Sequence, residues 1–377
     1  MDRRRFLIGS GVAIATLGGC QWANPFDQRD HLKVLGLLGA LPPKIIEQFP
    51  QSFKRKVEFK AEQLPSKLWQ ELQSFRDVIK EGKSDKIANI PATVSLSDGW
   101  LDPAIAQSLI QPINADLLTK MTQWQSLSPQ WREFVSRESK NGSGNGLQVW
   151  GLPYRWGATA IAYRSDKIKF EIKQWADLWR PELRRKITLP DDAREVIGLT
   201  LKKIGQSYQQ DLNLASNFAS LSQELKSLND QVLTYNSDTY LQSLLADDTF
   251  AAVGWTSDMF RAKRLNPELK IVIPQEGTAL WADIWVIPQG ITADEQAIAA
   301  AWMDFTISPA IAAQVTALTD AVSTSSSLDQ VPASVKADPI KFFAPDILAK
   351  SELISPLTAS AVNEYQELWT KMRSGSL

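Results

Sequence analysis

Histidine and cysteine are almost absent from this chain, and the two residues that occur lie near its N-terminus. Of 377 residues, one is a cysteine (Cys20) and one is a histidine (His31). A serine–histidine catalytic triad, a cysteine nucleophile and a zinc site of cysteine and histidine ligands are therefore not expected in the body of the chain. A single cysteine also excludes a disulfide within the chain. Any catalysis would depend on carboxylates, lysine or tyrosine.

An excess of charge of either sign is also missing. Lys and Arg total 41 and Asp and Glu total 42, which gives a net charge of −1 at pH 7. That balance gives no reason to expect nucleic acid or an acidic membrane surface as the main partner. We expect no cofactor and no bound metal ion.

Tryptophan, in contrast, is abundant. The chain has 14 Trp residues and 6 Tyr residues. Many tryptophans simply belong to a protein core, but such an excess suits a protein that binds ligands with ring faces. The length of the chain favours two domains.

The N-terminal segment has the pattern of an export signal. Arginines occupy positions 3–5, an apolar run extends from Ile8 to Leu17, and two glycines precede Cys20. The apolar run is short for a membrane span, so residues 1–20 are predicted to be a signal peptide. Its arginine pair resembles a twin-arginine signal, and residues 17–20 resemble a lipobox that makes Cys20 the lipidated first residue. Residues 21–31 would be a tether. A Sec signal with an incidental cysteine is the alternative.

After residue 31, short apolar runs alternate with longer amphipathic ones, which is typical of an α/β fold. We expect a helix over Pro65–Glu81 and strands over Lys186–Leu189 and Leu280–Ile287. Two further apolar runs, Val149–Tyr154 and Ala158–Arg164, are predicted to be paired strands on either side of Trp156-Gly157.

Two acids follow the predicted strand that ends at Leu189. Asp192 and Glu195 are spaced so that their carboxylates converge on one face at the start of a helix. The same spacing is a capping box, in which Asp192 caps the helix and Glu195 returns a hydrogen bond. The two interpretations are compatible, because ligands of open α/β sheets bind beyond the carboxyl ends of strands.

A third acid, Asp283, lies between Trp281 and Trp285 in a predicted strand. Alternation along the strand puts these three side chains on one face. Burying an unpaired carboxylate in a core is costly, and a cleft that binds an organic cation explains an acid between two indoles. The alternative is a buried Asp283 paired with an internal arginine.

Two turns add aromatic candidates. Gly254-Trp255 leads from a predicted strand into Ser257, which has the character of a helix cap, and Trp255 is expected at the strand end. Asp98 and Trp100 lie in a second turn after a strand, a pattern that is common and therefore less specific.

Together these segments resemble the bacterial spermidine/putrescine-binding proteins of polyamine uptake systems. The segments occur in one order, and they are Gly151–Thr159, Trp175–Trp179, Asp191–Val196, Gly254-Trp255 and Trp281–Asp283. The resemblance extends over most of the chain, and Asp191–Val196 is its most specific part. Members of that family are periplasmic solute-binding proteins that serve ABC importers.

The resemblance assigns roles to the candidate residues. It implies that the ligand's ammonium groups are held by Asp192, Glu195 and Asp283. It implies that Trp255 and Trp281 pack against methylene groups and that Trp100 lies near the ligand, with Asp98 beside it. We therefore expect Asp192→Asn or Asp283→Asn to lower polyamine affinity about tenfold or more.

Three aromatic positions of the family pattern are not aromatic here. Leu37 and Ala40 stand where the family has an aromatic pair, and the stretch Thr319–Ala321 contains no tyrosine. A linear polyamine remains the first prediction, and a shorter or differently substituted amine is an alternative.

The resemblance also implies a type II periplasmic binding protein fold with two lobes, each a mostly parallel sheet with helices on both faces. The expected first lobe is 32–154 plus 282–328, and the second is 155–281 plus 329–377. The ligand would be captured between the lobes and delivered to the ABC permease. We expect a monomer without enzymatic activity in the periplasm, anchored to the inner membrane through a lipidated Cys20.

Other functions stay open at this point. An exported hydrolase could use two carboxylates as glycosidases do, although Asp192 and Glu195 leave little room for a scissile bond between them. A binding protein for another amine, for an amino acid or for ferric iron is also compatible, with Tyr235 and Tyr240 as the nearest candidate iron ligands.

Overall fold

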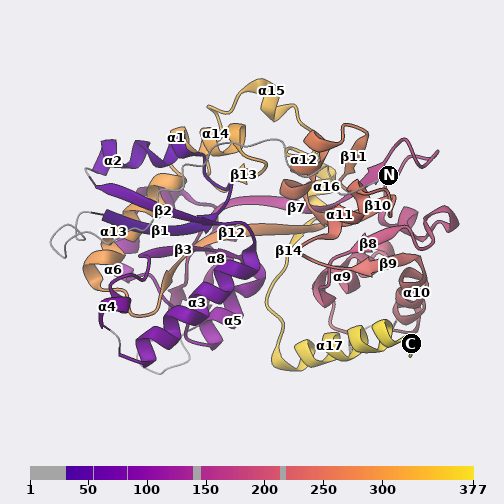
Figure 1. Ribbon diagram of the computed structural model, residues 1–377, viewed down its shortest axis with the longest axis horizontal. Helices are drawn as coiled ribbons and strands as arrows, with labels where there is room; N and C mark the ends of the chain where they lie inside the picture. The colour runs from indigo at the N-terminus through magenta and orange to yellow at the C-terminus, as the bar shows by residue number, and fades with distance from the viewer. Residues whose placement is uncertain (1–30, 54, 83, 139–145, 213–217) are drawn as a thin grey trace, which may run out of the picture. The chain divides into compact units, whose positions relative to one another are not determined.

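The computed structural model describes residues 31–377 apart from residues 54, 83, 139–145 and 213–217 (Figure 1). The predicted signal peptide, the lipidation site Cys20 and nearly all of the predicted tether lie outside the described residues. From Leu32 to Leu377 the chain forms one unit of packed helices and strands.

Strands of the described residues form one large sheet and one separate pair. The order of the main path is β2-β1-β3-β12-β7-β10-β8-β9, with β11 and β13 paired to β7 and with β4 and β14 paired to β12. The strands are β1 (His31–Leu37), β2 (Lys56–Glu62), β3 (Thr93–Ser97), β4 (Ile110–Gln111), β5 (Ser136–Glu138), β6 (Leu147–Val149), β7 (Leu152–Arg164), β8 (Ile187–Leu189), β9 (Val232–Tyr235), β10 (Ala251–Trp255), β11 (Leu269–Val272), β12 (Ala279–Pro288), β13 (Val322–Ser323) and β14 (Glu352–Leu353).

The expected α/β class is confirmed, but the sheet is mixed rather than mostly parallel. Strands β1 and β3, and likewise β8 with β9 and β10, are parallel neighbours, as strands joined by helical crossovers must be. The long strands β7 and β12 run antiparallel to each other, and each is also antiparallel to a further neighbour. In Figure 1 these two strands extend across the centre of the molecule.

The expectation of two paired strands around Trp156-Gly157 is wrong. Residues Leu152–Arg164 form one uninterrupted strand, β7. Gly157 is not part of a turn. Instead it lies opposite Trp281 of β12, and a Cβ at this position would come within 2.4 Å of the Trp281 ring. The glycine is therefore needed for close packing within a strand.

Helices cover the sheet and connect its strands. Helix α3 agrees with the helix expected over Pro65–Glu81, and it begins with a proline at its first position. The helices are α1 (Pro43–Ile46), α2 (Gln48–Phe53), α3 (Pro65–Lys80), α4 (Ser84–Ile87), η2 (Asp98–Trp100), α5 (Leu101–Ala106), α6 (Ala115–Lys120), α7 (Thr122–Ser126), α8 (Pro129–Phe134), η3 (Trp175–Trp179), η4 (Pro181–Leu183), α9 (Ala193–Lys203), α10 (Phe218–Gln231), α11 (Tyr240–Leu245), α12 (Thr256–Leu265), α13 (Ala293–Thr306), α14 (Pro309–Leu318), α15 (Ala333–Lys336), α16 (Pro345–Lys350) and α17 (Ala359–Ser374), where η denotes a 3₁₀ helix.

Buried apolar side chains form three clusters, and strands β7 and β12 contribute residues to each of them. The first cluster draws on residues 32–154 and 284–315. The second draws on residues 161–279 and 365–372, and the third on residues 158–280 together with Phe343. The lobe boundaries given above remain a prediction.

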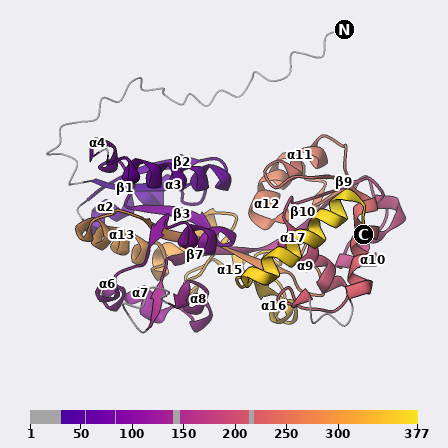
Figure 2. The same ribbon diagram turned by 90° about the horizontal axis from the view of Figure 1, so that it is seen from below.

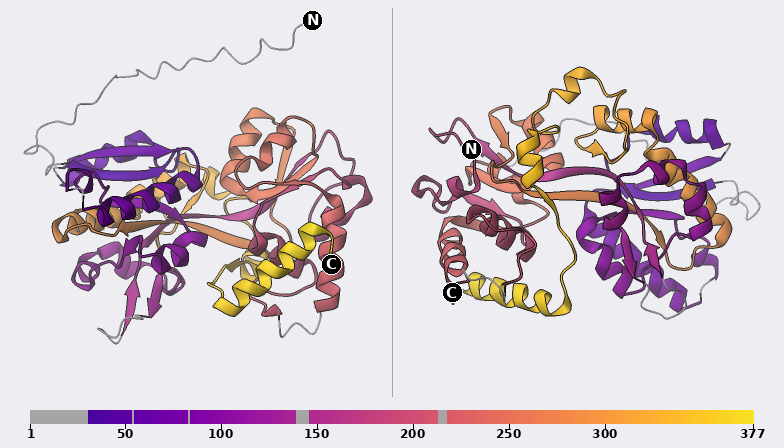
Figure 3. Two further views of the ribbon diagram at one scale, coloured as in Figure 1. Left: turned by 60° about the horizontal axis from the view of Figure 1, so that its bottom comes forward. Right: turned by 180° about the vertical axis from the view of Figure 1, so that it is seen from behind.

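The C-terminal segment returns to the second of these clusters. Helix α17 contacts α9 and α10, and its Tyr365, Leu368 and Met372 are buried there. Figures 2 and 3 show α17 beside these helices from three sides. Within the described ranges, no single helix is long and apolar enough to cross a membrane, and only the bent pair α13 and α14 passes the test of length and composition together.

Candidate functional site

Alternate residues of β7 and their partners on neighbouring strands share one face of the sheet. Because residues that lie opposite each other in a ladder point to the same side, the register defines the members of this face. The pairs are Arg155 with Asp283, Gly157 with Trp281, and Thr159 with Trp255. We call these six residues the β7 face. Arg155 and Thr159 are about 13 Å apart along the strand, because a strand rises about 3.3 Å per residue.

Asp192 caps helix α9, as one of the two sequence interpretations predicted. Its carboxylate accepts hydrogen bonds from the backbone N–H groups of Arg194 (2.8 Å) and Glu195 (3.1 Å). Glu195 does not complete a capping box. Its Oε1 accepts a hydrogen bond from the hydroxyl of Thr159 (3.1 Å), so this side chain is directed to the β7 face. The cap therefore fixes the start of the helix while the second acid is presented to the sheet.

Glu195 is the most unusual acid of the described chain. The residue is 7% exposed, and its Oε2 is buried with no hydrogen-bond partner among the described residues. Burial raises the pKa of Glu195 to about 8, and repulsion from Asp192 and Asp98 adds to the shift, while the Thr159 hydrogen bond opposes it. A buried carboxylate oxygen without a donor is costly, so this atom marks a place where a ligand donor would be stabilising.

Asp192 and Asp98 belong to the same electrostatic group. Desolvation of the Asp192 carboxylate raises its pKa, although more than a third of the residue as a whole is exposed. Burial and the neighbouring Asp283 raise the pKa of Asp98 to about 7. Asp98 lies close to β12, because it follows Ser97, which pairs with Asp283, and its carboxylate accepts from the backbone of Ala282. The predicted acids are thus linked in sequence, Asp192 to Glu195, Glu195 to Asp98, and Asp98 to Asp283.

Asp283 is already bound by an arginine. Arg155 donates from Nε to the Oδ2 of Asp283 at 2.7 Å, and its Nη2 lies 2.5 Å from the same oxygen. The two residues are only 4% and 5% exposed. This arrangement is the alternative that the sequence left open, a buried Asp283 paired with an internal arginine. Arg155 itself was not among the predicted site residues.

The predicted aromatic residues occupy three different settings. The Trp281 ring lies against Gly157, and its indole N–H donates to the carbonyl of Ala158 (3.1 Å). Trp255 is partly exposed at the end of β10 and meets the ring of Tyr240 edge to face at 5.6 Å. Trp100 is partly exposed in η2 and packs on Trp69, with ring centroids 5.2 Å apart.

Two details of the aromatic predictions are wrong. Trp285 does not share a cleft with Trp281. It is fully buried, stacked on Tyr154 and in contact with Trp302 of α13, because that helix covers this part of β12. Ser257 is not the helix cap either, since α12 begins at Thr256 and Trp255, two residues before Ser257, occupies the cap position.

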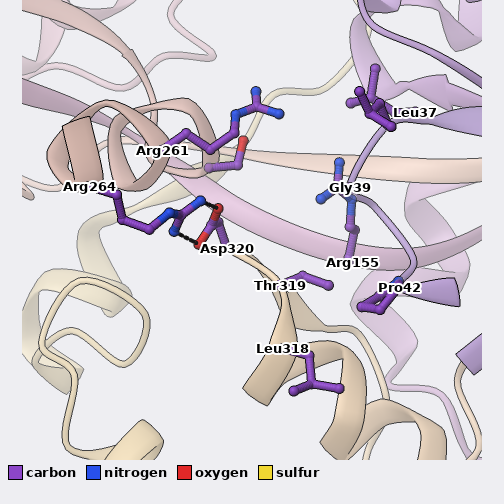
Figure 4. Close-up of a pocket in the computed structure, with 11 residues that line it drawn as sticks. Leu37, Gly39, Pro42, Arg155, Arg261, Arg264, Leu318, Thr319 and Asp320 are labelled. Carbon is purple, nitrogen blue, oxygen red and sulfur yellow. Dashed lines mark hydrogen bonds and ion pairs between the residues drawn. The ribbon is translucent and has the colours of Figure 1, made fainter. Parts of the chain in front are cut away.

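A pocket of about 350 Å³ lies at the Arg155 end of the β7 face (Figure 4). Its lining residues are Leu37, Leu38, Gly39, Pro42, Arg155, Ser257, Arg261, Arg264, Leu318, Thr319 and Asp320. None of the predicted acids or tryptophans lines it, and Arg155 is the member that it shares with the β7 face. The pocket lies where aromatic rings of the family pattern are missing, since Leu37, Thr319 and Asp320 all belong to its wall.

The pocket's only carboxylate is neutralised. Arg264 donates two hydrogen bonds to Asp320, at 2.8 and 2.7 Å, as the dashed lines of Figure 4 show. Arg261, which also faces the pocket, pairs with Asp258. In the part of the chain that the structure describes, no group of three or more acids, histidines or cysteines is arranged to hold a metal ion.

Comparison with known proteins assigns the family. The family model for bacterial extracellular solute-binding proteins matches residues 85–350. The chain belongs to this family. It is 29% identical over 276 residues to the spermidine/putrescine-binding periplasmic protein of Salmonella typhimurium. The aligned region covers 73% of this chain and 72% of that protein. It is 30% identical over 228 residues to spermidine/putrescine-binding periplasmic protein 1 of Haemophilus influenzae, with 60% and 62% covered.

The solved structures confirm the fold of this solute-binding protein. The crystal structure of the spermidine/putrescine ABC transporter substrate-binding protein from Streptococcus pneumoniae matches with a TM-score of 0.72. The match covers 92% of this chain and 100% of that chain at 18% sequence identity, a level that establishes the fold alone. The expected two-lobed type II fold and the expected class of function, solute binding, are both confirmed.

The two tyrosines that were candidate iron ligands both make hydrogen bonds within this solute-binding protein. The Tyr240 hydroxyl accepts from the backbone N–H of Trp255 (3.0 Å) and lies 3.1 Å from an oxygen of Asp258. The Tyr235 hydroxyl donates to Asn229 at 2.8 Å. Both hydroxyls are therefore already used in holding neighbouring segments together.

Arg155 is the residue of this site that sequence reasoning missed. It lies within a segment that was used for the family resemblance, Gly151–Thr159, but nothing local to that segment connects it to Asp283. The connection depends on the register between β7 and β12. The sequence did offer one indication, because the alternative interpretation paired a buried Asp283 with an internal arginine, but it did not identify which arginine.

Proposed function

We propose that this solute-binding protein captures a polyamine or a related linear amine and delivers it to the permease of an ABC importer. Its relatives in Salmonella typhimurium and Haemophilus influenzae are named for spermidine and putrescine binding. The proposed cycle consists of capture, closure of the lobes, delivery and release, without a chemical step.

The observation that carries this proposal is the unpartnered Oε2 of Glu195. An ammonium group presents three donors and a positive charge, so it satisfies this oxygen with a charge-assisted hydrogen bond. It also relieves the repulsion among Glu195, Asp192 and Asp98, which raises the pKa of Glu195 in the ligand-free chain. A neutral sugar would supply donors but would leave the repulsion unrelieved.

Aromatic faces would hold the methylene groups of the same ligand. Trp255 lies across the ladder from Thr159, which is the hydrogen-bond donor to Glu195. Trp281 follows along the β7 face toward Arg155. Ring faces pack against methylene groups and attract cations, so both contribute to binding an alkylamine. Trp100 and Asp98 would approach the ligand from the other lobe.

In this proposal the first lobe comprises 32–154 and 282–328, and the second comprises 155–281 and 329–377. Closing the lobes would remove water from the ammonium group and strengthen each charge-assisted bond. The protein would act as a monomer in the periplasm, with a lipidated Cys20 as its anchor in the inner membrane. Replacing Cys20 with Ala should release the protein from the membrane fraction, and continued membrane association of the variant would contradict the anchor.

Calorimetry with putrescine and spermidine tests the proposed function. We expect binding by the wild type and a loss of about tenfold or more in Glu195→Gln and in Asp192→Asn, which corresponds to about 1.4 kcal/mol or more. Unchanged affinity in both variants would exclude this site.

Asp304→Asn is the matched control for Asp192→Asn. Asp304 also accepts hydrogen bonds from two consecutive backbone N–H groups, those of Gln123 (2.8 Å) and Trp124 (3.2 Å), at the start of α7. It is not a member of the β7 face, so its replacement should disturb a comparable cap and leave ligand affinity within about twofold.

A further inference from the structure

We propose that Arg155 decides which amines this protein accepts. In this proposal Arg155 serves as an internal cation beside Asp283 and Trp281, so the ligand has one ammonium end, held at Glu195. The other end of the ligand presents a hydrogen-bond acceptor oxygen, of an amide or a carboxylate, to Arg155. The inference rests on the proposed function, because it takes the Glu195 end as an amine site.

The first argument is that the charge of Asp283 is already balanced by an internal cation. Two nitrogens of Arg155 contact its Oδ2, at 2.7 and 2.5 Å, and both residues are almost completely buried. The guanidinium carbon also lies 5.9 Å from the centroid of the Trp281 ring. A ligand ammonium group at Asp283 would compete with this buried guanidinium, which has no other ionic partner in the described chain.

The second argument concerns hydrogen-bond chemistry. A guanidinium group has five N–H donors and no acceptor, and Asp283 together with the Tyr154 hydroxyl uses only part of this set. Arg155 also lines the pocket of Figure 4, so a ligand that reaches the pocket meets donors and a positive charge. A second ammonium group is likewise a donor and a cation, and it is repelled there. A carbonyl or carboxylate oxygen is complementary.

The third argument is that the pocket holds no alternative acid. Asp320 is the only carboxylate among its lining residues, and Arg264 binds both of its oxygens. Arg261 adds a further guanidinium to the wall. The two ends of the ligand path therefore differ in kind. The Glu195 end attracts a cation, and the Arg155 end supplies donors.

Three ligands that share a four-carbon chain test this difference by calorimetry. They are 1,4-diaminobutane, which has two ammonium ends, and N-acetyl-1,4-diaminobutane and 4-aminobutanoate, which each have one ammonium end and one acceptor end. We expect the wild type to bind at least one of the acceptor-ended ligands at least tenfold more tightly than 1,4-diaminobutane. A preference of the wild type for 1,4-diaminobutane over both of them would overturn the inference.

Variants of Arg155 test whether this residue sets the order of the three affinities. Arg155→Met frees Asp283 for a second ammonium group, so it should reverse the order in favour of 1,4-diaminobutane. Arg155→Lys keeps a cation and should keep the wild-type order. Arg261→Met is the matched control, because it removes a guanidinium of the same pocket without freeing Asp283, and it should also keep the wild-type order. An Arg155→Met variant that retains the wild-type order would contradict the role of Arg155.

A further variant covers the case in which Arg155→Met does not fold. The pair Arg155→Met with Asp283→Asn removes both buried charges at this end of the β7 face, and it should bind the three ligands within about threefold of one another. Retention of a tenfold preference in this double variant would overturn the inference. Binding of 1,4-diaminobutane alone, weakened by Glu195→Gln, would contradict the role of Arg155 and leave the proposed function intact. No binding of any amine by the wild type would instead contradict the proposed function.

Discussion

The two ends of the β7 face each contain a buried acid, and the acids differ in what they have available for a ligand. Glu195 is 7% exposed and Asp283 is 5% exposed. One oxygen of Glu195 has a hydroxyl donor and the other has no partner in the described structure. Asp283 is bound by Arg155. Equal burial therefore does not mean equal function, because only an acid without a cation of its own can attract one.

The comparison also separates two effects that are easily confused. A buried ion pair between a carboxylate and an arginine is costly to break, although its net contribution to stability is small. An unpartnered carboxylate is costly to keep, and a ligand that satisfies it recovers that cost on binding. This difference supports the proposal that the Glu195 end of the β7 face binds the ammonium group and that the Arg155 end contributes to stability and selectivity.

The largest expected effect concerns the buried ion pair of Arg155 and Asp283. Asp283→Asn leaves Arg155 buried without its ionic partner, so the free energy of unfolding should fall by about 3–5 kcal/mol. Chemical denaturation measures this loss. Asp320→Asn is the matched control, because the side chain of its partner Arg264 is 60% exposed, and the loss there should stay below about 1 kcal/mol. Equal losses in the two variants would show that burial does not distinguish the pairs.

The next effect concerns the middle of the β7 face. A Cβ at Gly157 would lie 2.4 Å from the Trp281 ring and 2.6 Å from the Thr256 hydroxyl, so Gly157→Ala must displace one or both. Thermal or chemical denaturation should show a loss of about 1–3 kcal/mol, together with weaker amine binding. The control is Gly99→Ala, where a Cβ meets nothing within 4 Å, and its stability should change by less than about 0.5 kcal/mol.

A smaller effect is expected at the Glu195 end. Thr159→Val removes the hydroxyl that donates to Oε1, which should cost about 1 kcal/mol of stability. It should also raise the pKa of Glu195 further, because this hydrogen bond opposes the upward shift. Thr159→Ser keeps a hydroxyl and should resemble the wild type in both measurements. A serine variant as impaired as the valine variant would show that the methyl group matters and the hydrogen bond does not.

The last prediction is a pH dependence at the Glu195 end. Its pKa is about 8 in the folded chain and 4.5 ordinarily, so the folded chain binds the proton more tightly than the unfolded chain does. The stability of the ligand-free protein should therefore fall as pH rises from about 4.5 to 8. Amine affinity should rise about fivefold from pH 7 to 8, because ionised Glu195 is the binding form. Glu195→Gln should flatten this rise in calorimetry, and an unchanged slope would contradict the assignment.

Much of the fold could be predicted from local pattern. Alternating apolar runs gave the α/β class, and the apolar stripe with its leading proline gave helix α3. The cap at Asp192 was also predictable, since a capping motif involves only neighbouring backbone groups. In contrast, Trp156-Gly157 was misinterpreted as a break between strands. The glycine is explained by a ring from β12, more than a hundred residues later in the chain.

The candidate site shows the same division. Asp192, Glu195, Trp255 and Trp281 were selected from short motifs and family order, and the register places the last two on the β7 face with the donor to Glu195. Trp285 was misplaced because alternation gives the side of a strand but not what covers it. In the structure α13 covers that part of β12.

By itself, the sequence determined which chemistry this protein could use. One histidine, one cysteine and acids placed beside tryptophans were enough to predict carboxylates and indoles as the groups available to a ligand. Only the tertiary structure decided which acid is available. The pairing of Arg155 with Asp283 depends on the register of two strands far apart in the chain. A charge can be counted from the sequence, but its neutralisation depends on a contact of a few ångströms that only folding creates.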